Sequence, residues 1–99
     1  MTRYEQIAVY ILANKPYGTL YVGVTSFLLK RVYEHREHFV ESFTKRYGVT
    51  QLVYFDLHET MESAIHREKR LKKYTREQKI KLIERENPTW DDLWNRIAQ

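Results

Sequence analysis

The sequence contains no cysteine, only three glycines and two prolines, and no long hydrophobic run. Without cysteine, disulfides and thiolate zinc sites are excluded, and nothing implies an oxidising compartment. No stretch approaches the roughly 18 apolar residues of a membrane span. The apolar run at residues 7–13 is short for a signal peptide and lacks a small-residue cleavage site, so we interpret it as a strand. We therefore expect a cytoplasmic protein.

What is present is typical of a globular domain. The 99 residues are 42% hydrophobic and 30% charged, which is an ordinary composition for a folded chain. A chain of this length buries a modest core and usually forms one unit. We expect a single domain over residues 1–99.

The hydrophobic pattern predicts three strands. Short apolar runs at residues 7–13 and 19–24 flank a turn-rich segment, which indicates a hairpin. Residues 52–55 form a third β-rich run after Gly48. The sequence predicts a small three-stranded antiparallel sheet.

Capping signals place four helices around these strands. Ser26 is expected to begin a helix that reaches about Phe39, and Thr60 to begin a second. Residues 75–78 match a capping box for a third helix that ends at 87–88, and Thr89 is expected to begin a short last one. The order β-β-α-β-α-α-α defines an α+β fold in which helices flank the sheet.

Positive charge is concentrated in one segment. Residues 67–81 hold eight basic and two acidic residues, a net charge of +6, whereas the segments on either side are acidic. This distribution favours a surface that faces a polyanion, although a solvated helix face has the same composition.

Glu68 interrupts an apolar helical pattern. It follows Ala64 by four residues and precedes Leu71 by three, at the centre of a stripe that also includes Met61 and Ile65. A carboxylate that faces a core is costly unless a cation, a metal or strong donors compensate it. Glu68 is therefore either a structural ion-paired residue or part of a functional site.

Arg31 and His35 lie one turn apart at the border of the apolar face of the first helix. A guanidinium there can bind a phosphate, and an imidazole can hold or relay a proton near neutral pH. His35 fits a structural role equally well. The His35–His38 pair does not predict zinc, because cysteine is absent and His58 and His66 have no ligand-like spacing to it.

The hairpin carries two tyrosines that we expect on one face. Tyr10 and Tyr21 would lie opposite one another if the loop has the matching even length, and Gly23 on that face would leave space for an approaching group. The two phenols are either packing residues or polar groups directed into a site.

These positions resemble the GIY-YIG endonuclease superfamily. Residues 8–10 (Ala-Val-Tyr) and 21–23 (Tyr-Val-Gly) resemble its two signature triplets. Arg31 lies ten residues after Tyr21, as the superfamily pattern requires, and His35 follows one turn later. Residues 62–73 resemble the helix that carries the metal-binding glutamate, at Glu68. Residues 43–47 and 87–90 resemble small, stand-alone bacterial members, which are related to the N-terminal nuclease domain of a DNA-repair excinuclease.

The resemblance implies a divalent-metal-dependent DNA endonuclease. It would be structure-selective or weakly sequence-specific and would act in DNA repair or recombination. Glu68 would hold one Mg²⁺ or Mn²⁺ ion, without a small-molecule cofactor, and Arg31 would neutralise charge on the phosphoryl group. Tyr10 would deprotonate the attacking water, with its pKa depressed by the metal and Arg31 or through a relay with His35 or Tyr21.

The expected partner is DNA, with a recruiting protein as a further candidate and no membrane. The residues expected along the DNA backbone are basic: Lys45, Lys69, Arg70, Lys72 and Lys73. Two other functions stay open. One is a nucleic-acid-binding module on a nuclease fold with little or no catalysis, and the other is an adaptor that uses residues 90–97.

Three positions depart from the superfamily pattern. Ala8 replaces the first glycine, which is a mild change on a strand, and Val24 stands where many members carry a lysine. Asn87 is farther behind Glu68 than the corresponding asparagine of those nucleases. One phosphate or metal contact is therefore either missing or supplied by Lys45 or Asn87.

Overall fold

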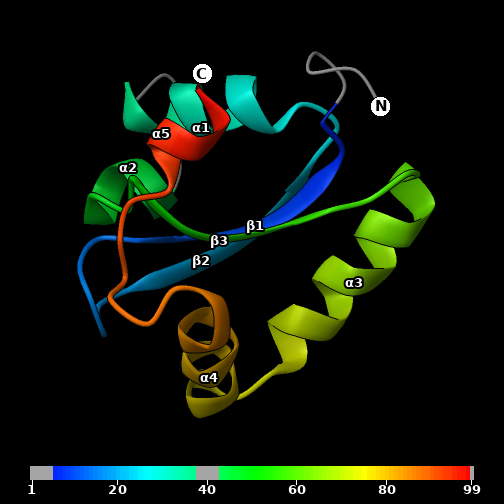
Figure 1. The fold of residues 1–99 in the computed structure, drawn as a ribbon. Coiled ribbons are helices and arrows are strands. Elements are labelled where there is room, and N and C mark those ends of the chain that lie inside the picture. Colours follow the sequence, from blue (N-terminus) through cyan, green and yellow to red (C-terminus); the bar gives the residue numbers. More distant parts are fainter. Residues whose placement is uncertain (1–5, 38–42, 99) are drawn as a thin grey trace.

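The computed structural model describes residues 6–37 and 43–98. Its centre is a three-stranded antiparallel sheet, as the sequence predicts, with strand order β2-β1-β3 (Figure 1). The strands are β1 (Ala8–Ala13), β2 (Leu20–Thr25) and β3 (Gln51–Leu57). Because β1 is central and buried along its whole length, any side chain it carries has a fixed position.

The register of the hairpin differs from our expectation. Tyr10 lies opposite Gly23, and Leu12 lies opposite Tyr21, so the predicted Tyr10–Tyr21 pairing is wrong by two residues. The loop determines this register, because the Asn14 side chain accepts a hydrogen bond from the Thr19 amide at 2.9 Å and closes the turn there. A shift of two residues preserves the side-chain alternation, so both tyrosines still point to one face.

The first helix, α1 (Leu28–Arg36), is shorter than predicted. Ser26 is not its cap: Phe27 occupies the capping position, and its amide donates to Thr25 Oγ1 at 3.1 Å. The expected end at Phe39 lies outside the described residues. A short helix that the sequence pattern did not predict, α2 (Phe43–Tyr47), precedes β3.

Two helices begin where their capping signals predicted. The Thr60 side chain caps α3 (Met61–Lys73), and the Thr75–Gln78 capping box begins α4 (Arg76–Glu86). The prediction that Thr89 begins the last helix is wrong, since α5 covers only Trp94–Ile97. Trp90 has a φ of 58°, a left-handed conformation that a helix cannot contain.

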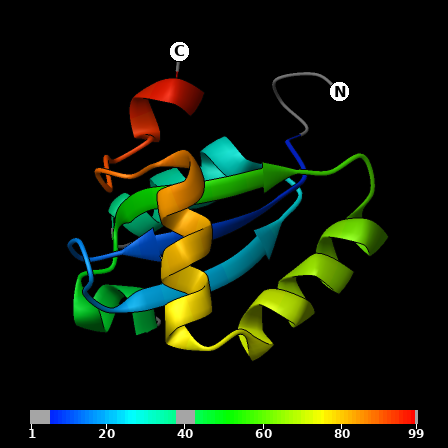
Figure 2. The same cartoon turned by 60° about the horizontal axis from the view of Figure 1, so that its bottom comes forward.

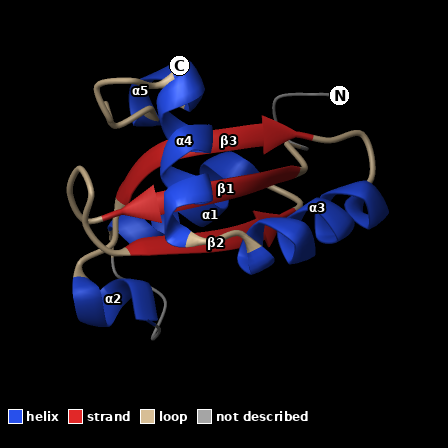
Figure 3. Cartoon of the chain, turned by 90° about the horizontal axis from the view of Figure 1, so that it is seen from below, coloured by secondary structure: helices blue, strands red, loops and turns tan. Residues whose placement is uncertain are grey.

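Helices cover both faces of the sheet (Figures 2 and 3). One face, which we term the α3–α4 face, packs against the buried side chains of those two helices, such as Leu71 and Ile83. The other, the α1 face, packs against Leu28 and Val32 of α1 and Ile97 of α5. None of the helices in the described part of the chain is long and apolar enough to cross a membrane.

The two tryptophans of the C-terminal segment both pack on the domain. Trp90 is buried on the α3–α4 face. Trp94 stacks with Tyr33 at a ring distance of 6.4 Å, and the Arg36 guanidinium lies 5.0 Å from its ring centre. This packing gives both rings structural contacts within the chain.

Candidate active site

Tyr10 is locked into the α1 face of the sheet by a glycine. It is only 1% exposed, and its ring lies over Gly23 on the neighbouring strand. A Cβ atom at Gly23 would lie 2.5 Å from the Tyr10 hydroxyl and Cζ, closer than side-chain contacts allow. The space that we expected Gly23 to leave is therefore filled by Tyr10 itself.

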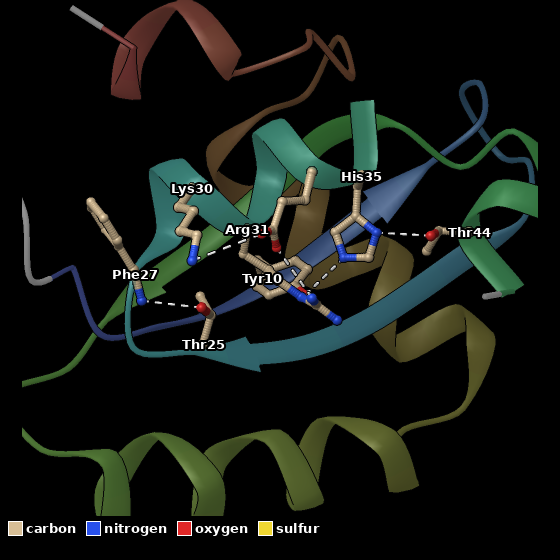
Figure 4. Close-up of polar contacts among 8 residues, drawn as sticks. Tyr10, Thr25, Phe27, Lys30, Arg31, His35 and Thr44 are labelled. Carbon is tan, nitrogen blue, oxygen red and sulfur yellow. Dashed lines mark hydrogen bonds and ion pairs between the residues drawn. The ribbon is translucent and has the colours of Figure 1, made fainter. Parts of the chain in front are cut away.

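A buried chain of three side chains begins at Tyr10 (Figure 4). The Tyr10 hydroxyl is 3.1 Å from His35 Nε2, and His35 Nδ1 is 2.8 Å from Thr44 Oγ1. His35 and Thr44 are 1% and 0% exposed, so His35 lies in the interior and not at the border we expected. Thr44 lies in the segment 43–47 that carries part of the resemblance, but no pattern gave it a role in the site, because it reaches His35 from the unexpected helix α2.

Arg31 determines which way the hydrogen bonds of this chain run. Its guanidinium hydrogen-bonds the Tyr10 hydroxyl and lies 3.3 Å from Glu34 Oε1. A guanidinium only donates, so the Tyr10 oxygen accepts from Arg31, and the Tyr10 hydrogen is available for His35 Nε2. When that hydrogen is directed to Nε2, a neutral His35 carries its own hydrogen on Nδ1, where the Thr44 hydroxyl can accept it.

The environment keeps both rings of the chain neutral. Burial raises the pKa of Tyr10 to about 12, with a further contribution from Tyr21, while Arg31 acts in the opposite direction. In the metal-free protein desolvation outweighs the arginine, so the expected depression of the Tyr10 pKa, which requires a bound metal, stays a prediction. Burial, with help from the Arg31 charge, lowers the pKa of His35 to about 4.

Tyr21 and Arg31 form the accessible side of this cluster. Tyr21 is half-buried, and its ring centre lies 6.3 Å from that of Tyr10 and 5.6 Å from that of His35. The Arg31 side chain is 36% exposed. A group that arrives from solvent therefore reaches Arg31 and Tyr21 before it reaches the Tyr10 hydroxyl.

Glu68 lies outside this hydrogen-bonded cluster, on α3. The buried stripe of that helix consists of Ala64 and Leu71, whereas Ile65 is 38% exposed. Glu68 is therefore on the flank of the stripe, and its predicted central position is wrong. Its side chain is 13% exposed and pairs with Lys72 Nζ at 2.7 Å. Among the described residues, no hydrogen bond or ion pair joins Glu68 to Tyr10, Arg31 or His35.

The donor set fits a hard cation that retains most of its water. Residues 6–37 and 43–98 contain no cluster of three or more metal-ligating side chains, so a closed zinc site is absent there, and His38 lies outside this part. Mg²⁺ commonly binds through one or two carboxylates together with substrate phosphates. Glu68 matches that requirement as a largely buried carboxylate.

Only part of the basic segment is available to a polyanion. Arg67 lies 3.6 Å from Asp56, and Arg76 donates to the backbone carbonyls of Tyr17 and Gly18. Lys72 pairs with Glu68 and Lys81 with Glu77. The exposed cations outside these contacts are on the outer side of α3: Lys69, Arg70 and Lys73.

Lys45 and Asn87, the two residues considered as substitutes for a missing phosphate or metal contact, lie in different surroundings. Lys45 is exposed on α2, the helix that also carries Thr44. Asn87 is buried and structural, since its side chain donates to the Val53 and Asp91 carbonyls and accepts from the Asp91 amide. Asn87 is therefore excluded as a phosphate or metal contact.

Comparisons with known proteins agree with this architecture. A family model described as the GIY-YIG catalytic domain matches residues 6–81, so the chain belongs to the GIY-YIG family. It is also a member of the small UPF0213 proteins. A UPF0213 protein of Clostridium perfringens is 41% identical over 76% of this chain and 80% of the relative. A UPF0213 protein of Staphylococcus saprophyticus is 35% identical over 76% of this chain and 90% of the relative. Another, of Haloquadratum walsbyi, is 38% identical over 67% of this chain and 74% of the relative.

No solved structure gives a significant match. The GIY-YIG catalytic domain suggests a nuclease, with a nucleic-acid substrate and a divalent metal. The UPF0213 names of the relatives state no activity.

Proposed function

We propose that this protein is a divalent-metal-dependent DNA endonuclease that recognises the structure of its substrate more than its base sequence, with a role in DNA repair or recombination. The observation that carries the proposal is the Tyr10–His35–Thr44 chain with Arg31 beside the phenol. Buried polar chains are costly to build, and this one ends at an arginine accessible to a phosphate.

Arg31 has the first role in this proposal. Its planar guanidinium can bind two oxygens of a phosphate and stabilise the charge that develops there. When Arg31 turns from Tyr10 toward the phosphate, it uncovers the phenol oxygen. As Tyr10 accepts a proton from the attacking water, its own hydroxyl proton passes to His35 Nε2, so the phenol ends neutral and His35 holds the proton.

Glu68 is the proposed ligand of one Mg²⁺ or Mn²⁺ ion. The bound ion supplies charge stabilisation at phosphate oxygens and the leaving group. Because Glu68 is the one carboxylate we assign to the ion, we propose that binding of the ion and of DNA depend on each other. Lys72, now on Glu68, is free to turn to the DNA backbone when the carboxylate binds a cation.

Glu68→Gln tests the proposal directly. We expect metal-dependent cleavage of nicked, flapped or branched DNA to be lost, with EDTA abolishing the wild-type reaction. The metal-free melting temperature should stay the same or rise, since Lys72 is 54% exposed and such pairs contribute only about 0–1 kcal/mol. Glu77→Gln, which removes an exposed glutamate paired with Lys81, is the matched control and should cleave normally.

Two results would contradict the proposal. A Glu68→Gln protein that cleaves at the wild-type rate would remove Glu68 from the site. DNA binding without any cleavage in Mg²⁺ or Mn²⁺ would favour a nucleic-acid-binding module, a function consistent with the burial of Tyr10.

A further inference from the structure

Thr44 is the buried end of the side-chain chain, and it touches the ring nitrogen that faces away from Tyr10. Its Oγ1 lies 2.8 Å from His35 Nδ1, and Thr44 itself is completely buried. Because α1 and α2 approach each other at this contact, Thr44 binds His35 from the side opposite the candidate site.

We propose that Thr44 is a positioning residue that holds neutral His35 in the Nδ1–H form and thereby fixes the direction of the Tyr10 hydroxyl. The direction follows first from Arg31, which can only donate to the Tyr10 oxygen. The Tyr10 hydrogen therefore needs an acceptor, and His35 Nε2 at 3.1 Å provides it.

The other nitrogen of the His35 ring is where Thr44 acts. A neutral imidazole with an unprotonated Nε2 carries its hydrogen on Nδ1, where a buried donor without an acceptor would be costly. Thr44 Oγ1 supplies that acceptor. The opposite tautomer would place two donors on the Tyr10 oxygen, those of Arg31 and His35, and leave the phenol hydrogen without its partner.

The tautomer of His35 decides whether the Tyr10 hydroxyl presents an acceptor or a donor to the site. With its hydrogen turned inward to His35, Tyr10 presents an oxygen lone pair and not a hydrogen toward Arg31 and the entrance. The charged or titratable groups around His35 are Tyr10, Tyr21, Arg31 and Glu34. The tautomer depends on contacts of this chain alone, whereas its catalytic consequence rests on the proposed nuclease function.

Nitrogen-15 NMR of the imidazole rings tests the tautomer without any activity. In wild-type protein at pH 7 we expect His35 to show a protonated Nδ1 and an unprotonated Nε2, with the signals assigned by comparison with His35→Gln. In Thr44→Val, which replaces the hydroxyl by a methyl group, the ring should move to the Nε2–H form or to a mixture. Thr44→Ser should restore the wild-type pattern.

Cleavage kinetics then test the role in the site. Thr44→Val should lower kcat at least about tenfold with KM little changed, because a misplaced tautomer disables a histidine-supported group. Thr44→Ser should recover most of the rate. Thr25→Val is the matched control, since Thr25 accepts a hydrogen bond from the Phe27 amide and does not contact His35.

The outcomes separate the two proposals. An Nε2–H wild-type ring, or an unchanged ring in Thr44→Val, would overturn the role of Thr44. The expected tautomers in a wild-type protein that never cleaves DNA would support that role and contradict the nuclease function. If Thr44→Val does not fold, the wild-type and Thr44→Ser spectra still decide the tautomer.

Discussion

The two faces of the sheet are built on different principles. On the α3–α4 face, the buried cluster against the sheet consists of hydrophobic residues together with Tyr54 and Trp90. On the α1 face, the equivalent layer contains a polar chain of Tyr10, His35 and Thr44. Both layers are closed to solvent, so the difference is chemical and not one of exposure.

The buried polar side chains differ in what they hydrogen-bond. The third buried polar side chain of the described residues, Asn87, bonds only to backbone groups and holds the turn after α4. His35 instead hydrogen-bonds two side chains, those of Tyr10 and Thr44. The α3–α4 face therefore supplies the purely hydrophobic packing against the sheet, whereas the α1 face carries the buried polar chain of the candidate site.

The largest effect should come from breaking the α3–α4 face. Ile83 is completely buried, so Ile83→Ala should lower the free energy of unfolding by about 2–5 kcal/mol. The rate of cleavage per folded molecule, measured well below the melting temperature, should not change. Ile65→Ala, at a position 38% exposed, should shift stability by no more than about 0.5 kcal/mol. Equal losses at both positions would contradict the division between the faces.

Arg31→Lys should do the opposite of Ile83→Ala: it should lower the cleavage rate. It keeps the charge but loses the planar fork, so cleavage should fall by roughly 100-fold or more. DNA affinity in Ca²⁺ should change by about tenfold or less, which is about 1.4 kcal/mol. Arg36→Lys, which alters an arginine of the same helix paired with Asp92, is the control and should cleave normally. Proportional losses of affinity and rate would make Arg31 a simple anchor.

The pH dependence of stability should report the buried imidazole. The pKa of His35 is about 4 when folded and 6.5 by its ordinary value, so between these pH values the unfolded chain binds more protons. The contribution of neutral His35 to the free energy of unfolding is therefore fully present above pH 6.5. It falls as the pH decreases toward 4, by at most about 1.4 kcal/mol per pH unit. Thermal melts of His35→Gln should show a shallower fall, while the exposed His66→Gln should match wild type. Identical pH profiles for all three proteins would contradict the burial of a neutral His35.

The smallest effect should come from the outer side of α3. Lys69 and Lys73 are exposed, and replacing both by alanine should flatten the slope of log K against log[salt] by one to two units. The loss should be similar on unrelated DNA sequences. Lys81→Ala, which removes a lysine paired with Glu77, should change the slope less. A loss confined to one DNA sequence would indicate base recognition by this helix.

Sequence reasoning succeeded where a signal is local. The Thr60 cap and the Thr75–Gln78 capping box predicted the starts of α3 and α4, because each depends on residues within one turn. The three strands followed from short apolar runs between turn residues. The order of the elements was enough for the fold class, and the order and spacing of Tyr10, Tyr21, Arg31 and Glu68 were enough for the family.

Sequence reasoning failed where an individual packing or side-chain contact, and not a periodic pattern, decides the structure. The Asn14–Thr19 closure sets the hairpin register, and the periodicity of the strands cannot determine it. For Glu68, counting Met61 and Ile65 as core shifted the apolar stripe, although only the packing of α3 decides which residues are buried. Thr44 belongs to a segment that resembles family members, but its contact with His35 could not be predicted, because that contact depends on how α2 packs against α1.

The nesting of Tyr10 on Gly23 has a consequence for how related sequences are compared. The two triplets are far apart in the sequence, yet the Tyr10 ring of the first packs directly on Gly23 of the second. A substitution at Gly23 therefore also displaces the Tyr10 ring, because a Cβ atom there would lie 2.5 Å from it. Ala8, by contrast, lies at the end of β1 opposite Thr25 and has room for its methyl group in the core. We therefore expect relatives to keep the tyrosine and the glycine together, whereas the buried position 8 should accept either of the two smallest residues, glycine or alanine.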